Sequence, residues 1–254
     1  MDAIYALTAA HIASAPTSNA PSSGQDYVQA ASHYHAQTVS ALQTAITTSS
    51  CGTSVFIASL LTLATAVVLP LLHREAGAKN CVLEQMYGLM KGIHTVVDMN
   101  TDEIRMGPCG SIFGQLSSPD CVPVAGDAER LRRLRQLGVK YAAGNSRLIC
   151  EIAIDELEKG YLFNRKRAIS WVGKVGPDFI DAVKKEDPYP NLVLLYWAVL
   201  LCRLDGMWWA KYAGRILVKE LTDRFGCLYD DSWSEAIEWV GAELRGTSGD
   251  ERGP

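Results

Sequence analysis

The segment "VFIASLLTLATAVVLPLL", residues 55–72, limits most strongly what this chain can fold into. It holds 18 uncharged residues, which approaches the length of a membrane span and requires burial on most sides of a helix in water. Ser59, Thr62 and Thr65 interrupt the run, Pro70 lies near its end, and no basic flank sets a membrane orientation. We therefore expect a buried core helix and no membrane span, with a membrane helix as the alternative.

Helical patterns dominate the rest of the chain, and strand-like alternation over four or more residues is hard to find. The patterns predict helices over 2–14, 27–47, 81–99, 128–144 and 146–171, and an apolar helical segment over 191–225. Loops are expected at 15–26 and 105–127, the second as a flap or a connector, and a break at 185–190. These expectations describe one all-α domain over 1–254, with a disordered tail at 247–254.

Composition restricts the partners and the compartment. The chain of 254 residues is 48% hydrophobic, enough for a substantial core. Its formal net charge of -4 argues against nucleic acid as a direct partner. Seven cysteines, odd in number and without a C-x-x-C pair, indicate reduced thiols in an intracellular protein. The first residues lack a basic leader and include Asp2 and His11, so we expect a cytoplasmic protein.

The stretch "DDSWSEAIE", residues 230–238, is a candidate metal site. Its oxygen donors are Asp230, Asp231, Ser234 and Glu238. Side chains at steps of four lie near one face of a helix, so Asp230, Ser234 and Glu238 could converge on one Mg²⁺, which prefers hard oxygen ligands. The alternative is structural: either aspartate caps a helix that begins near Ser232, and Glu238 is simply solvated.

A second candidate site lies in the segment 196–215. Arg203, Met207, Lys211 and Arg215 follow one another at steps of four, which predicts one shared helical face. Cations on an apolar helix either reach solvent, pair with carboxylates, or meet an anion in a pocket. Asp205, which precedes a glycine, marks a break in the helix or reaches a metal from the same side.

Aromatic and basic residues complete the candidate set. Tyr196, Trp197, Trp208 and Trp209 lie on the same segment; aromatic faces attract carbocations, but aromatics at helical spacing also form ordinary cores. The basic run "RLRRLRQLGVK", residues 130–140, could attract phosphate or form the solvated face of an amphipathic helix.

Several patterns, in the same order, carry a family resemblance. "YPNLVLLYWAVLLCRLDGMWWAKYAGRILVKEL" followed by "WSEAIEWVGAELRG" resembles the C-terminal regulatory domain of fungal zinc-cluster transcription factors of the sterol-uptake-regulator type. "DAIYALTAAHIAS" and "ISWVGKVGPDFIDAV" are similar to further landmarks of that domain. The resemblance implies a helical cup with a central apolar pocket for a lipid. The six closely spaced cysteines of the DNA-binding half are absent from this sequence.

The stretch "RLDGMWWAK", residues 203–211, is also similar to atypical class I humulene synthases of fungal tropolone-sesquiterpenoid pathways. That resemblance implies Mg²⁺ as cofactor and farnesyl diphosphate, an isoprenoid diphosphate, as substrate. It also implies a diphosphate-binding role for Lys211, helped by Arg203 and Arg215, and control of alkene geometry by Met207. The usual partner motif D-D-x-x-D is absent from the chain.

Two functions from different classes follow. The chain is a Mg²⁺-dependent sesquiterpene cyclase, or it is a lipid-sensing regulatory domain without its DNA-binding region, which would act in the nucleus. The missing zinc cluster, the acidic nonapeptide and the Met207/Lys211 spacing favour the enzyme. The sequence leaves open which terpene forms, whether the chain forms a homodimer, and whether Met1 is the true start.

Overall fold

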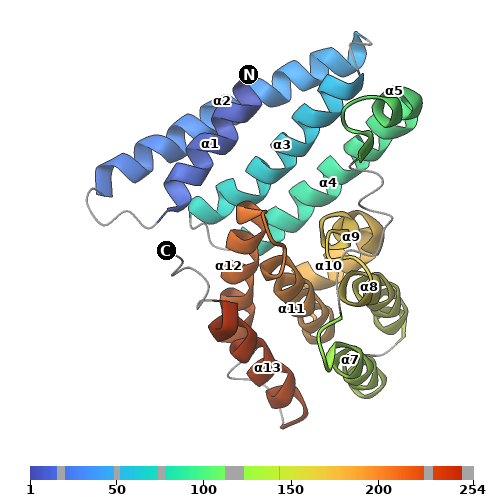
Figure 1. The fold of residues 1–254 in the computed structure, drawn as a ribbon. Coiled ribbons are helices and arrows are strands. Elements are labelled where there is room, and N and C mark those ends of the chain that lie inside the picture. Colours follow the sequence, from blue (N-terminus) through green and yellow to red (C-terminus); the bar gives the residue numbers. More distant parts are fainter. Residues whose placement is uncertain are drawn as a thin grey trace. The chain divides into compact units, whose positions relative to one another are not determined.

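The computed structural model describes residues 1–15, 21–48, 52–73, 78–111, 123–142, 144–225 and 231–247. These residues form helices and no strand, which confirms the all-α fold class. The chain divides into two compact units, Met1–Gln115 and Leu116–Pro254 (Figure 1). A single domain and a central apolar pocket stay predictions. The last helix ends at Thr247, and the rest of the predicted tail lies outside the described residues.

The first unit is built from α1 (Asp2–Ser14), α2 (Pro21–Thr47), α3 (Gly52–Leu72), α4 (Ala78–Met99) and α5 (Thr101–Met106). Helix α1 has the predicted bounds, and its buried alanines Ala6 and Ala10 allow close packing on α2 and α3. Helix α2 begins at Pro21, so residues 21–26 are helical where a loop was predicted. Proline at the first position of a helix loses no hydrogen bond and has a suitable φ, which explains the earlier start.

Helix α3 contains the uncharged apolar run of residues 55–72. It is the one helix among the described residues that is long and apolar enough to cross a membrane, and 72% of its most apolar window is buried. The hydroxyls of Ser59, Thr62 and Thr65 each donate to the carbonyl four residues earlier, at 2.7–2.9 Å. Its first turn is capped by Glu103, whose carboxylate accepts from the backbone N–H groups of Gly52 and Thr53. These hydroxyls and the first backbone N–H groups of the helix are thereby satisfied inside the unit.

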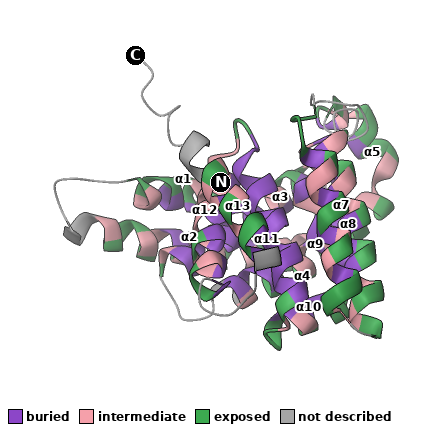
Figure 2. Ribbon diagram, turned by 90° about the horizontal axis from the view of Figure 1, so that it is seen from below, coloured by how far each residue is buried: buried purple, intermediate pink, exposed green. Residues whose placement is uncertain are grey.

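The second unit contains α7 (Asp127–Tyr141), α8 (Asn145–Leu162), α9 (Arg167–Val175), α10 (Pro177–Lys184), α11 (Pro188–Cys202), α12 (Trp208–Phe225) and α13 (Asp231–Thr247). Helix α11 contacts each of the other six. Every residue from Tyr189 to Cys202 is buried, and Figure 2 shows this helix coloured as buried. An apolar helix with no polar face can be stable in water only when it is surrounded in this way.

Buried aromatic side chains around α11 place their polar atoms on backbone carbonyls. The Tyr189 hydroxyl donates to Leu134 at 2.9 Å, and the indole N–H of Trp197 donates to Ala168 at 2.8 Å. The Tyr161 hydroxyl donates to the carbonyl of Tyr196 at 2.7 Å. Since an unpaired buried donor is costly, these bonds set the positions of α7, α8 and α9 relative to α11.

The predicted helix over 146–171 is broken in the structure, so that prediction was wrong, and the predicted helical segment 191–225 is interrupted as well. Residues 146–171 form α8 and α9, separated at Asn164, whose side-chain oxygen accepts from the backbone N–H of Lys166 at 3.0 Å. Residues 191–225 form α11 and α12, and Gly206 between them has φ +74°. The break at Asp205 was one of the two predicted readings of that residue, and it is confirmed. Both interruptions use residues that favour turns over helix interiors.

Helix α12 packs against α11 at very short range. A Cβ atom added at Gly214 would lie 2.7 Å from the carbonyl oxygen of Ala198 and 2.8 Å from the Cys202 sulfur. Glycine at this position therefore allows the two backbones to approach where any side chain would push them apart.

The buried thiols of the second unit are expected to resist alkylation. Burial raises the pKa of Cys150 and of Cys202 to about 12 in each case. A thiol in an unfolded chain has a pKa of about 8.5. Raising the pH above that value favours the unfolded state, because only there do these thiols ionise readily. At pH 8, iodoacetamide should leave the peptides that carry Cys150 and Cys202 unlabelled, with complete labelling in urea, as read by mass spectrometry. Rapid labelling of either thiol in native buffer would contradict this placement.

Candidate functional site

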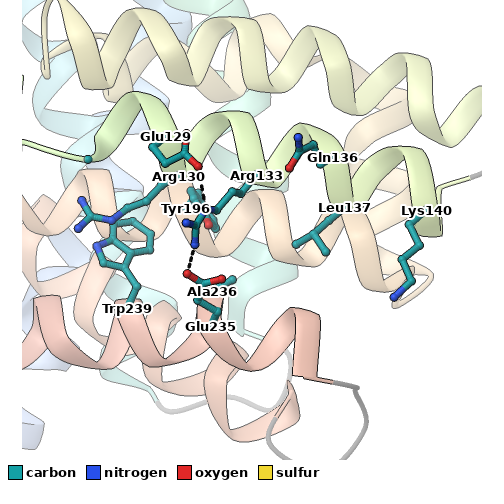
Figure 3. Close-up of a pocket in the computed structure, with 11 residues that line it drawn as sticks. Glu129, Arg130, Arg133, Gln136, Leu137, Lys140, Tyr196, Glu235, Ala236 and Trp239 are labelled. Atoms are coloured by element: carbon teal, nitrogen blue, oxygen red, sulfur yellow. Dashed lines mark hydrogen bonds and ion pairs between the residues drawn. The ribbon is translucent and has the colours of Figure 1, made fainter.

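A cleft of about 580 Å³ lies in the second unit, between α7 and α13. Its lining side chains come from three helices: α7 supplies one wall, α13 supplies the other, and α11 contributes one residue beneath them (Figure 3). The lining residues are Gly126, Glu129, Arg130, Arg133, Gln136, Leu137, Lys140, Tyr196, Glu235, Ala236 and Trp239. A volume of this size is within the range of roughly 300–1,000 Å³ that is typical of small-molecule sites.

The periodicity of α7 explains why its basic side chains reach the cleft. Leu131 and Leu134 are buried, whereas Arg130, Arg133 and Lys140 line the cleft, at spacings of three and seven residues. Residues at these spacings lie on one side of a helix, so the apolar face packs inward and the basic face borders the cleft.

The deeper part of the cleft is aromatic. The rings of Tyr196 and Trp239 have their centroids 4.9 Å apart with planes tilted by 45°. The guanidinium of Arg130 lies 5.0 Å from the centre of the Trp239 ring, a cation–π contact. Burial raises the pKa of Tyr196 to about 12, so its phenol stays neutral at physiological pH.

A buried ion-pair cluster lies next to this aromatic pair. Arg203, at the end of α11, contacts Asp127 of α7 at 2.7 Å and Glu243 of α13 at 2.8 Å. The side chains of Arg203 and Asp127 are only 7% and 1% exposed. Burial lowers the pKa of Arg203, but Tyr161, Glu243 and Asp127 outweigh it, and the pKa lies above its ordinary value. The permanently charged arginine therefore joins the two walls of the cleft.

The ion pairs at the mouth of the cleft are different, because they are exposed. Arg133 contacts Glu129 at 2.9 Å on its own helix and Glu235 on α13 (Figure 3). Its hydrogen bonds and those of Arg132 lower the pKa of Glu129 to about 2. Glu129 is therefore ionised at any physiological pH, and Arg133 bridges two carboxylates.

Lys211 is not among the residues that line the cleft. Lys211 Nζ lies 2.9 Å from the Asp205 carboxylate, and the two side chains are 39% and 82% exposed. Because the helix breaks before Trp208, Arg203 and Met207 do not continue the helical face of Lys211 and Arg215, so the single shared face was a wrong prediction. Arg203 pairs with the buried carboxylate of Asp127 and with Glu243, which agrees with its predicted role as a salt-bridge partner.

The four predicted aromatics have different environments. Tyr196 lines the cleft. Trp197 is completely buried and stacks on Trp171, with ring centroids 5.3 Å apart and planes at 20°. Trp208 and Trp209 are partly exposed at the start of α12, as is Met207 just before it. A substrate-binding role for these residues stays a prediction; only Tyr196 is in the lining of the cleft.

Two residues of the acidic nonapeptide line one wall of the cleft. Asp230 lies outside the described residues, and α13 begins at Asp231. Ser234 and Glu238 are exposed, whereas the neighbouring Glu235 and Ala236 line the cleft. Among the described residues, no group of three or more histidine, cysteine or acidic side chains is placed to hold a metal ion. The metal-ligand role of these donors and of Asp205 stays a prediction.

Sequence reasoning did not select the residues that line this cleft on α7. Arg130, Arg133 and Lys140 belong to the basic run 130–140, for which phosphate attraction and a solvated face were both considered. The helical spacing of these basic residues was the available signal. Their acidic partner Glu235 on α13 is 102 residues from Arg133 in the sequence, and only folding brings the two together.

The arrangement suits an amphipathic anion, since basic groups border the mouth and aromatic rings form the floor. No known family model, curated protein or solved structure matches this chain.

Proposed function

We propose that this protein is a Mg²⁺-dependent sesquiterpene cyclase that ionises farnesyl diphosphate and forms humulene or a related hydrocarbon. One observation carries the proposal: Glu235 and Ala236 of the nonapeptide line one wall of a cleft, opposite a basic wall on α7 and beside the aromatic pair Tyr196 and Trp239. The leaving diphosphate concentrates negative charge as the allylic bond breaks, and positioned cations stabilise that charge.

In this proposal the parts of the cleft have separate roles. Arg133 and Lys140 attract the diphosphate, while Tyr196 and Trp239 form an electron-rich surface for the prenyl chain and its cation. The neutral Tyr196 phenol supports this role, because an ionised phenol would capture the cation. Lys211 and Met207 keep the roles that the resemblance implies, at the edge of α12.

The described donors of α13 fit Mg²⁺ chemically. Ser234 and Glu238 offer a hydroxyl and a carboxylate one helical turn apart, on an exposed face that diphosphate oxygens and water can complete. When bound, Mg²⁺ would neutralise charge on the diphosphate. Glu238 would hold it, with Ser234 and the aspartates at 230 and 231.

The proposal is tested by incubating purified protein with farnesyl diphosphate, with and without Mg²⁺, and analysing volatile products by gas chromatography and mass spectrometry. We expect a sesquiterpene hydrocarbon that forms only when Mg²⁺ is present. Release of farnesol alone, or no conversion of the diphosphate, would contradict the cyclase assignment.

Two variants locate the ionisation step. Lys211→Ala and Asp230→Ala should each abolish the product while circular dichroism remains that of the parent protein, as the resemblance implies. Arg133→Gln tests the cleft in the same assay. Unchanged turnover in Lys211→Ala together with loss in Arg133→Gln would move diphosphate binding from α12 to the α7 wall.

A lipid-sensing regulatory domain is the second candidate. The pairing of Lys211 with Asp205 near the surface, and the exposure of Ser234 and Glu238, favour it, because these are the features of solvated helices without a metal site. In that case a sterol or another lipid should raise the melting temperature, and farnesyl diphosphate should not be consumed.

A further inference from the structure

The basic side chains around the cleft differ in how readily their carboxylate partners can be replaced. Arg130 lies 3.0 Å from Asp127, which also pairs with Arg203 and has a side chain only 1% exposed. Separating either arginine from Asp127 would leave a buried charge with a weaker partner, which is strongly unfavourable. Arg203 is therefore committed to joining the two walls, and Arg130 is committed to Asp127 on its own helix.

Arg133 is in the opposite situation. Its side chain is 45% exposed, and those of Glu129 and Glu235 are 44% and 69% exposed. Exposed ion pairs contribute little to stability, because water solvates both partners when they separate. Arg133 can therefore exchange its carboxylate partners for another anion at small cost.

The exchange would leave neither carboxylate buried without a partner. Glu129 retains Arg132, which donates two hydrogen bonds to it at 2.8 Å and 2.6 Å. Glu235 is the more exposed of the two and would turn to solvent. Glu235 is also the partner that comes from the opposite wall, so its contact with Arg133 crosses the mouth of the cleft (Figure 3).

We propose that Arg133 is the anion-binding residue of the cleft and that Glu235 is its resident counter-ion, which the phosphate or diphosphate of a ligand displaces. The guanidinium offers planar paired donors that match phosphate oxygens, and the aromatic pair Tyr196 and Trp239 lies deeper in the same cleft for the apolar part of the ligand. The inference deepens the proposed function and rests on it for the class of ligand. It assigns to Glu235 a role of limiting affinity for weaker anions.

The test measures binding of inorganic pyrophosphate by titration calorimetry at low ionic strength, without Mg²⁺, so that the predicted metal donors do not contribute. Arg133→Gln should weaken binding by about tenfold or more, and Glu235→Gln should tighten it by about fivefold, since a repelling and competing charge is removed. The exposed pair Arg147 and Glu151 on α8, at 3.0 Å, supplies matched controls with the same charge changes. Arg147→Gln and Glu151→Gln should leave the affinity within about twofold.

The proposal is overturned if Glu235→Gln fails to tighten binding, or if Arg147→Gln weakens it as much as Arg133→Gln, which would indicate only the general field of the surface. The test of the anion site can also be distinguished from the test of cyclase activity. The expected pattern with pyrophosphate in a protein that forms no terpene would support the anion site and reject the cyclase. Formation of a terpene, with no effect of Arg133→Gln or Glu235→Gln on pyrophosphate binding, would support the cyclase and reject the anion site.

Discussion

Replacing Arg203 by alanine is expected to lower the free energy of unfolding by about 3–5 kcal/mol. The substitution leaves Asp127 buried with Arg130 as its remaining described ion-pair partner, and it removes the link from α11 to Glu243 on α13. The guanidinium also lies 5.2 Å from the Tyr161 ring, and that contact is lost as well. The large effect follows from the burial of the carboxylate that remains, since a buried charge that loses its main partner cannot be fully solvated.

The measurement is urea unfolding followed by circular dichroism and tryptophan fluorescence. Arg132→Ala is the matched control: Arg132 pairs with an exposed carboxylate and is itself 58% exposed, so its loss should change stability by no more than about 0.5 kcal/mol. The double variant Arg203→Met with Asp127→Asn should recover part of the loss, because it removes both charges. A loss below about 1 kcal/mol for Arg203→Ala would contradict a structural role and return Arg203 to the list of diphosphate ligands.

Replacing Trp197 by alanine is expected to cost about 3–5 kcal/mol of stability, the range for removing a fully buried large aromatic side chain. The change would remove the stacking contact with Trp171 and the hydrogen bond to the Ala168 carbonyl, and it would leave a cavity in the centre of the second unit. Trp197→Phe should cost less, since a ring remains in the cavity and chiefly the hydrogen bond is lost.

Chemical unfolding of the two variants checks this expectation, with Phe163→Ala as control. Phe163 is an aromatic residue of the same unit that is 56% exposed, and its loss should stay within about 0.5 kcal/mol. If Trp197→Ala has the stability of the parent protein but loses terpene formation, the side chain contacts substrate and the core assignment is wrong.

The structure also changes which residues the proposed activity depends on. Of the cations predicted from the sequence, Lys211 lies near the surface and Arg203 lies in a structural ion pair, whereas Arg133 and Lys140 on α7 border an aromatic cleft. Substitutions of Arg133 and Glu235 now give the most direct test of ligand binding. Neither residue was selected as a site residue from its sequence pattern. The cyclase and sensor candidates share this cleft and differ in whether the bound molecule is converted.

Local patterns predicted the parts of the fold that depend on neighbouring residues. Helix α1 has its expected bounds, the run in α3 is a largely buried helix, and the Asp205–Gly206 pair lies in the predicted break, between α11 and α12. Hydrophobic period, turn residues and chain length determine these features, because each acts within a few residues.

The sequence by itself determined the all-α class, the apolar helical character of residues 191–202 and the presence of basic residues at helical spacing over 130–140. Only the tertiary structure decided that Arg203 is enclosed by Asp127 and Glu243, and that Arg133 meets Glu235 across a cleft. The physical reason is that a charged side chain has the same local pattern whether it is solvated, buried in an ion pair or poised for a ligand. Its role is set by the carboxylates and the solvent around it, which come from helices far away in the chain.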